Sequence, residues 1–312
     1  MAAYLGHMSE THLDSSEKPC GLCEKSEPLR VSHVLPAFVF KWAKETSATG
    51  YLRFSQNPNR RVQDGLKFPW LCGDCEGLLS REETAFATQA FHPINDDRNT
   101  QVAYEEWLLR FCVSVSWRVL SYYRLEGQLA HLSGAQRAAA DAASQRWSDF
   151  LFGRVPHPGA FEQHIVPLDV IEATNVGGLP ENINRYLARS IDMDLPCGKR
   201  SAMTFAKLGR FALFGFIVPQ RTKWEGSKVH VLSGTLGGRV NYTLPEDILE
   251  FFTSRARVHA KIAEDISDTQ HDKIERAVLG DLERARQSGT LEAMLYDERM
   301  FGTEAVLRRP KG

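Results

Sequence analysis

Two pairs of cysteines constrain the fold of this 312-residue chain more strongly than any other feature of the sequence. Cys20 and Cys23 form one Cys-x-x-Cys pair, and Cys72 and Cys75 form the other. The first pair lies in a turn with proline and glycine, and the second opens a helical pattern. Two intervening residues let each pair occupy two corners of a tetrahedron, so four thiolates suit one zinc ion. The sequence therefore predicts a structural zinc site that joins a turn to the start of a helix.

The composition is that of an ordinary globular protein, with 43% hydrophobic and 25% charged residues. The formal net charge is −1, so any binding of nucleic acid would require a local basic patch. The start of the chain has no signal-peptide pattern, and the longest apolar run is far below the ~20 residues that span a bilayer. We therefore expect a cytoplasmic protein without membrane contact, in which cysteines serve as ligands or buried thiols rather than disulfides.

The sequence divides into three regions. Residues 1–16 are expected to form a flexible leader, and residues 17–98 form a module that contains both cysteine pairs. Turn residues near position 98 close this module. Residues 99–312 are expected to form a mostly α-helical α+β domain whose role the sequence does not indicate.

Hydrophobic periodicity predicts the elements of the third region. Helical patterns cover residues 102–123, 134–152 and 245–304. A short strand is expected at 164–168 and a hairpin at 228–240. Residues 201–218 match neither period, which leaves a buried helix and a pair of strands as open alternatives. The overall prediction is an α+β fold in which the zinc module packs on a larger, mostly helical domain with a small β-hairpin or sheet.

The cysteine module resembles the zinc-containing branch of the HNH endonuclease family. The resemblance rests on the two cysteine pairs, on Ser-His-Val-Leu-Pro at residues 32–36, and on Leu-Cys-Gly-Asp-Cys at residues 71–75. It covers about residues 17–92, a quarter of the chain. The resemblance implies a treble-clef fold of the ββα-metal type, in which a β-hairpin and a helix surround a divalent metal. It also implies that His33 is the general base.

Three positions differ from the pattern of that family. Ser32 replaces the aspartate that ligates the catalytic metal, Lys67 replaces an asparagine, and Glu76 replaces a histidine or asparagine. The site is therefore either degenerate or rebuilt with oxygen ligands. In the rebuilt form, Glu76 with Glu83 or Asp64 would hold Mg²⁺ or Mn²⁺, because these cations prefer carboxylate oxygens. The alternative is that Glu76 complements the helix dipole and Glu83 lies on a solvated face.

The loop at residues 51–67 has a local excess of positive charge. It contains Arg53, Arg60, Arg61 and Lys67 and one acidic residue. Such a loop is suited to contact the phosphates of a nucleic acid, with DNA as the expected partner. The alternative is an ordinary solvated surface loop.

Two functions of different classes follow from the resemblance. The first is a metal-dependent HNH-like nuclease that hydrolyses phosphodiester bonds, as in bacterial antiviral defence. The second is a non-catalytic zinc finger with a degenerate HNH site, which binds nucleic acid or a protein. In both, the C-terminal helical domain would be the surface for a protein partner. Fold alone does not decide between them, because function depends on the geometry of the site.

Overall fold

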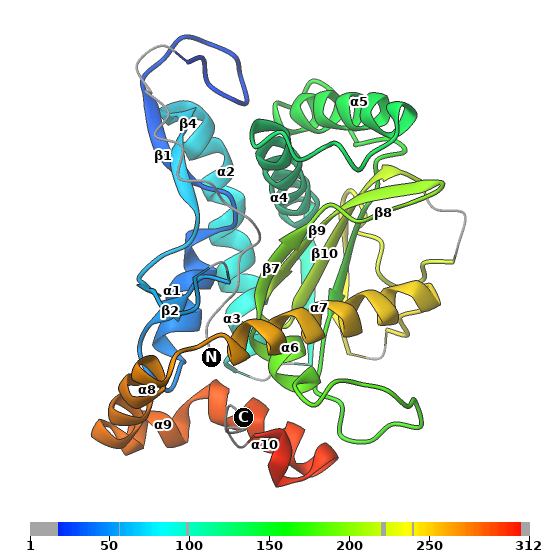
Figure 1. Ribbon diagram of the computed structural model, residues 1–312. Coiled ribbons are helices and arrows are strands. Elements are labelled where there is room, and N and C mark those ends of the chain that lie inside the picture. Colours follow the sequence, from blue (N-terminus) through cyan, green and yellow to red (C-terminus); the bar gives the residue numbers. More distant parts are fainter. Residues whose placement is uncertain (1–17, 56, 98–99, 220–222, 239, 307–312) are drawn as a thin grey trace.

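The computed structural model describes the whole chain except residues 1–17, 56, 98–99, 220–222, 239 and 307–312 (Figure 1). It is 46% helical and 20% strand, which confirms the predicted mixture of helices and small sheets. The expected leader at residues 1–16 lies outside the described residues.

An antiparallel strand pair followed by a helix forms the centre of the cysteine module. Its main elements are β1 (Leu29–His33), α1 (Ala37–Glu45), β4 (Lys67–Cys72) and α2 (Gly73–Phe86). β1 pairs with β4 so that Leu29 lies opposite Cys72 and His33 lies opposite Lys67. Between them, β2 (Leu52–Arg53) and β3 (Arg61–Val62) form a short ladder. Because α2 begins directly after β4, the second cysteine pair lies where strand becomes helix.

Two strands in the region after α2 differ from our predictions. The chain continues through η1 (Ala87–Phe91), α3 (His92–Asn95), β5 (Gln101–Glu105) and α4 (Glu106–Leu125). Residues 101–105 thus form a strand with alternating burial, whereas we expected a helix from residue 102. β5 pairs with β11 (Ser233–Gly237), so the hairpin expected within residues 228–240 is also wrong. A Cβ at Gly234 would lie 2.3 Å from the Tyr104 hydroxyl, which shows how closely the two strands approach.

A five-stranded antiparallel sheet is the largest element of the second half. Its strands are β6 (Gln163–Pro167), β7 (Ile191–Asp194), β8 (Cys197–Gly198), β9 (Ser201–Leu208) and β10 (Phe211–Val218). The order is β6-β10-β9-β7, with β8 also paired to β9. The ambiguous residues 201–218 are therefore a strand pair. Their periodicity was uninformative because almost every position in both strands is buried.

Helices cover both faces of this sheet (Figure 1). α4 and α5 (Gly134–Leu151) pack on one face, and α6 (Ile183–Arg189) and α7 (Glu246–Glu264) pack on the other. Neighbouring residues of β10 point to opposite layers, as in any strand. Leu213 belongs to the core under α4 and α5, whereas Phe214 contacts Phe252 of α7 at a ring distance of 6.2 Å.

The cysteine module shares its core with the α4 side of the sheet. The rings of Phe86 on α2 and Phe111 on α4 are stacked 4.0 Å apart. Trp70 of β4 and Trp117 of α4 are stacked at 5.2 Å. One continuous group of buried side chains therefore extends from the module to the sheet, so α4 positions the module by packing against both α2 and β4.

The C-terminal helices return to the cysteine module, as Figure 1 shows. They are α8 (Asp268–Gly280), α9 (Leu282–Gln287) and α10 (Gly289–Phe301), followed by η2 (Thr303–Ala305). The Arg284 guanidinium donates to the carbonyl oxygens of Lys44 and Ser47 at 3.0 Å each. These contacts join the last helices to the end of α1.

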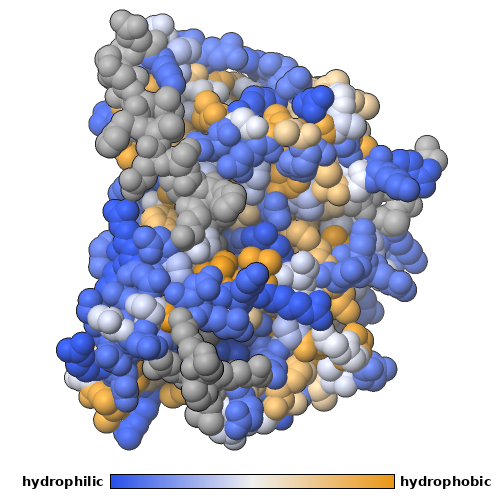
Figure 2. Space-filling model, in the orientation of Figure 1, coloured by the Kyte–Doolittle hydropathy of each residue, from blue (hydrophilic) through white to orange (hydrophobic). Residues whose placement is uncertain are grey.

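Hydrophilic residues cover most of the molecular face in Figure 2, with small hydrophobic areas between them. Among the described residues, no helix combines the length and apolar character that crossing a membrane requires.

Candidate metal centre and the His33 site

The thiols of Cys20, Cys23, Cys72 and Cys75 lie together between the N-terminal turn and the first turn of α2. Their sulfur atoms all lie within 4.8 Å of one another, and Sγ of Cys23 is 3.7 Å from Sγ of Cys72. A tetrahedral zinc ion with Zn–S bonds of ~2.3 Å separates its sulfur ligands by about 3.8 Å. The four cysteines can therefore hold a metal ion, and their spacing is compatible with structural zinc.

A tight turn holds the first cysteine pair against β4. The N–H of Glu24 donates to the carbonyl of Cys20 at 2.9 Å, and Glu24 has a φ of 61°. The N–H of Gly21 donates to the carbonyl of Trp70 at 2.9 Å. A Cβ at residue 21 would lie only 2.2 Å from Nε1 of Trp70, so glycine is required there. Contacts within the protein therefore hold the turn on β4 without a contribution from a metal ion.

Backbone hydrogen-bond donors and burial have opposite effects on the pKa of a cysteine thiol. Burial raises the pKa of Cys20, but N–H groups of Cys23, Cys72 and Leu22 lower it to about 7. For Cys75, burial and the neighbouring Cys72 sulfur both raise the pKa. Four thiolates in this small space repel one another, and a divalent cation would offset that repulsion.

His33 ends β1 and contacts Asp64. Its Nε2 lies 2.9 Å from Oδ2 of Asp64, and Nζ of Lys67 lies 2.7 Å from the same oxygen. The imidazole is also stacked near the Phe40 ring at 6.3 Å. Burial raises the pKa of Asp64, but the contacts with Lys67 and His33 outweigh it and leave this pKa below its usual value. The structure therefore places an ionised carboxylate beside the imidazole.

Ser32 faces the opposite side of β1 and contacts α2. Its hydroxyl donates to Oε2 of Glu76 at 2.6 Å, and Ser32 is buried. Consecutive strand residues point to opposite faces, so Ser32 and His33 have different surroundings although they are adjacent. The contact joins the end of β1 to the first turn of α2.

Glu83 pairs with a buried arginine of α4. Nη2 of Arg118 lies 2.6 Å from Oε1 of Glu83, and Nη1 of Arg118 donates to the carbonyl of His33 at 3.3 Å. Arg118 thus connects α2, α4 and the end of β1. We did not predict a role for this residue, although an arginine within a strongly apolar stretch of helix is a signal of a buried ion pair.

The candidate catalytic residues do not form one compact ligand group. Among the residues that the structure describes, the four cysteines are the group of histidine, cysteine or carboxylate ligands close enough to hold an ion. His33 and Asp64 lie together, whereas Glu76 and Glu83 have separate partners, Ser32 and Arg118.

The basic residues of the 51–67 loop have different environments. Arg53 is only 2% exposed and donates to the Pro58 carbonyl and to Gln270 of α8. We expected Arg53 to contact a phosphate, but the side chain is too buried to do so. Arg60 and Arg61 are exposed, and the Arg61 guanidinium lies over the Tyr51 ring at 4.0 Å. Lys67 is exposed as well but points to Asp64.

No protein-family model matches this chain, and no match was found among curated proteins or solved structures.

Proposed function

We propose that this protein is a metal-dependent, HNH-like nuclease that hydrolyses phosphodiester bonds of nucleic acid. The observation that carries the proposal is the contact of His33 with Asp64 at the end of β1. Ser32, the preceding residue, contacts Glu76 of α2 on the other face of the same strand. A strand pair, a following helix and a four-cysteine cluster at their junction support it.

In this proposal, zinc at Cys20, Cys23, Cys72 and Cys75 is structural and the module is a treble clef. A closed set of four protein ligands leaves no position for water or substrate, as structural zinc sites require. Zinc would fix the turn at Cys20 to the first turn of α2 and so hold β1 against the helix.

His33 would act as the general base that removes a proton from the attacking water. Asp64 would orient the imidazole and stabilise its protonated form through the 2.9 Å contact with Nε2. In this role Asp64 is a positioning residue rather than the metal ligand considered from the sequence. Arg118 would fix the backbone of His33 through its carbonyl oxygen.

Ser32 and Glu76 would hold the catalytic Mg²⁺ or Mn²⁺. Their hydroxyl and carboxylate fit such a cation because both offer oxygen, and Mg²⁺ usually keeps several water ligands besides one or two carboxylates. Such a metal stabilises the charge that develops on the leaving oxygen. Glu83 is less suitable because it neutralises the buried Arg118.

The proposed substrate is DNA, contacted by the exposed Arg60 and Arg61, with Lys67 near the His33 site. Phosphate contacts of this kind position a substrate without selecting its sequence. A protein partner would bind the C-terminal helical domain, and bacterial antiviral defence is the role that we propose.

A second candidate is a non-catalytic zinc finger that binds nucleic acid or protein. The specific observation in its favour is that Glu76 and Glu83 both have polar partners within the chain. Neither carboxylate therefore requires a cation to be satisfied, as expected if the HNH site is degenerate.

Cleavage assays separate these candidates. Purified protein would be incubated with plasmid, linear and single-stranded DNA and with RNA, in the presence of Mg²⁺, Mn²⁺ or Ni²⁺. We expect cleavage by the wild type and a loss of about 100-fold or more in His33→Ala, because general-base catalysis contributes roughly 10²–10⁴ in rate. His131→Ala is the matched control, because its ring is exposed and hydrogen bonds with the Leu195 carbonyl, which is not part of the His33 site.

Cleavage that His33→Ala leaves unchanged would exclude His33 as the base. If the wild type shifts the mobility of DNA but cleaves none of the substrates with any metal, the second candidate is correct.

A further inference from the structure

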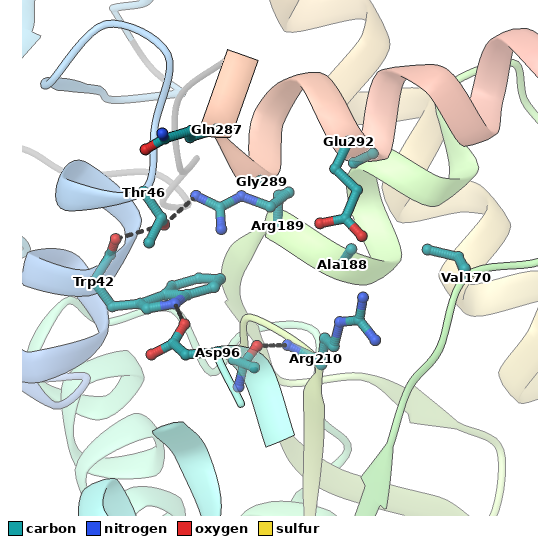
Figure 3. A pocket seen from close by; sticks show the side chains of 12 residues that line it. Trp42, Thr46, Asp96, Val170, Ala188, Arg189, Arg210, Gln287, Gly289 and Glu292 are labelled. Carbon is teal, nitrogen blue, oxygen red and sulfur yellow. Dashed lines mark hydrogen bonds between the residues drawn. The ribbon is translucent and has the colours of Figure 1, made fainter. Parts of the chain in front are cut away.

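A cavity of about 300 Å³ lies where the cysteine module, the sheet domain and the C-terminal helices meet (Figure 3). Its lining comes from all three parts of the chain and includes Trp42, Thr46, Asp96, Arg189, Arg210 and Gly289. The volume is at the lower end of the range of small-molecule sites, which runs from ~300 to ~1,000 Å³. Charged side chains of both signs line it, so we asked what ligand their arrangement suits.

Arg189 of α6 is the first charged group in this cavity. Its Nη2 donates to Oγ1 of Thr46 at 2.7 Å, and its guanidinium lies 4.1 Å from the centre of the Trp42 ring. Among the described residues, no carboxylate lies within ion-pair distance of it. Burial lowers the pKa of Arg189 to about 10, with the charges of Asp96 and Glu292 opposing this effect. A cation in such a place gains from an anionic ligand, because burying an unpaired charge is costly.

Arg210 is the second cation, and it lies in the turn between β9 and β10. Its backbone N–H donates to Oδ1 of Asn95 at 3.2 Å, which fixes its position at the cavity. Its Nη1 lies 2.9 Å from Oδ1 of Asp169, whose side chain is 80% exposed. An ion pair with so exposed a partner is weak, and a ligand can replace it at little cost.

Two acidic residues, Asp96 and Glu292, also line the cavity. Asp96 accepts a hydrogen bond from Nε1 of Trp42 at 2.8 Å, and its other oxygen lies 2.6 Å from Nδ1 of His92. Both oxygens of Asp96 thus have protein partners. Glu292 of α10 points into the cavity in Figure 3, on the side of Arg210.

We propose that this cavity binds a small molecule that carries a phosphate or carboxylate group, which Arg189 and Arg210 engage. Planar guanidinium groups form paired, charge-assisted hydrogen bonds with such oxyanions. The proposal does not depend on nuclease activity, because none of the lining residues belongs to the His33 site.

The bound ligand would also join the three parts of the molecule. Gly289, the first residue of α10, donates its N–H to the Thr46 carbonyl at 3.1 Å. A Cβ at this residue would lie 2.8 Å from Nη1 of Arg189, so α10 closes directly over the guanidinium. Occupancy of the cavity should therefore hold α10 more firmly against α1 and α6.

Calorimetric titration at constant ionic strength tests the proposal with three probes: inorganic phosphate, a nucleoside monophosphate and citrate. Comparing the Kd of phosphate with that of the nucleotide shows whether the nucleoside part of a ligand contributes to binding. Citrate shows whether the cavity binds carboxylate groups. We expect saturable binding of at least one probe. Arg210→Gln should raise its Kd about tenfold to hundredfold, because a hydrogen bond to a charged group contributes on this scale.

Arg154→Gln is the matched control for Arg210→Gln. Arg154 also pairs with a single aspartate, Asp149, but follows α5 and does not line the cavity. Its Kd should stay at the wild-type value. Arg189→Lys is a second variant, which keeps the charge but loses the planar fork, and it should also weaken binding. The proposal is overturned if no probe binds the wild type, or if Arg210→Gln and Arg189→Lys bind as tightly as Arg154→Gln.

Discussion

His164 shows how one buried side chain makes stability depend on pH. It lies on β6, is 2% exposed, and its Nδ1 is 2.9 Å from the Ser227 hydroxyl. Its ring is stacked on Phe216 at 4.4 Å. Burial lowers the pKa of His164 to about 4, although the Glu162 carboxylate, 3.6 Å from Nε2, raises it. The folded protein therefore holds this histidine neutral.

We predict that His164 makes the protein less stable as pH falls from about 6.5 to about 4. An unfolded histidine takes up a proton near pH ~6.5, whereas the folded one does so only near pH 4. The neutral His164 therefore makes its full contribution to the free energy of unfolding above the pKa of the unfolded state. This contribution is lost as the pH falls toward the folded pKa of about 4. Between pH ~7 and pH ~5 the loss should be about 2 kcal/mol. Urea unfolding of wild type and His164→Gln at both pH values measures it.

His157→Gln is the control for this experiment, because His157 is exposed. Other groups also titrate between these pH values, so the informative quantity is the difference between variants. Equal pH dependence in wild type and His164→Gln would contradict the prediction.

At the residue scale, the sequence predicts side chains with a local pattern and misses those that depend on packing. The four cysteines follow from their spacing, and their sulfur atoms do lie together. The contacts of Ser32 with Glu76 and of Arg118 with Glu83 depend on the register of β1 and on how α2 meets α4. No local sequence signal contains that register.

The β1–β4 pair and α2 form an element whose ends meet at the cysteine cluster. The N–H of Cys72 donates to Sγ of Cys20 at 3.2 Å, at the point where the strand becomes a helix. Two strands alone have little independent stability in water. A metal ion at their end would therefore contribute much of the stability of this element.

We predict that Cys72→Ser loses the metal and disorders this element. Structural zinc contributes roughly 10 kcal/mol or more in small zinc domains, which exceeds the total stability of many proteins. Metal analysis should give one zinc per wild-type chain and less in the variant. Fluorescence of Trp70, which packs on the turn at Gly21, should shift toward that of an exposed indole.

Cys197→Ser is the control, because Cys197 is exposed and remote from the cluster in sequence. It should keep both the metal and the fluorescence. A Cys72→Ser protein that retains zinc and a buried Trp70 would disprove the assignment of this ligand.

At the element scale, prediction succeeded where local periodicity is strong. The helix expected at 134–152 is α5, and the strand expected at 164–168 is β6 with a shift of one residue. The β5–β11 pair was missed because its strands are more than 100 residues apart, so nothing local relates them. The sheet strands at 201–218 were ambiguous because both faces are buried.

At the scale of the whole molecule, one arginine joins two helices that lie far apart in the sequence, α9 and α1. The Arg284 guanidinium donates to the carbonyls of Lys44, Glu45 and Ser47, at the C-terminal end of α1. The last carbonyls of a helix lack partners within it and carry partial negative charge, so a cation there is favourable. Arg284 thus holds α9 on the cysteine module.

We predict that Arg284→Met loosens the C-terminal helices while the sheet stays folded. Hydrogen exchange of amides in α8, α9 and α10 should accelerate by about tenfold, because a hydrogen bond from a charged donor contributes roughly 1.5–3 kcal/mol. Arg286→Met is the matched control on the same helix, because Arg286 is exposed. Acceleration of the same size in both variants would show that the contact with α1 is unimportant.

The same contact has a consequence during synthesis of the chain. Arg284 and Lys44 are 240 residues apart, yet the Arg284 guanidinium donates a hydrogen bond to the Lys44 carbonyl. Ribosomes add ~5–20 residues per second, so α1 waits roughly ten to fifty seconds after its own synthesis before α9 exists to cover its end. During that time the carbonyl groups at the end of α1 lack the donor that covers them in the folded protein.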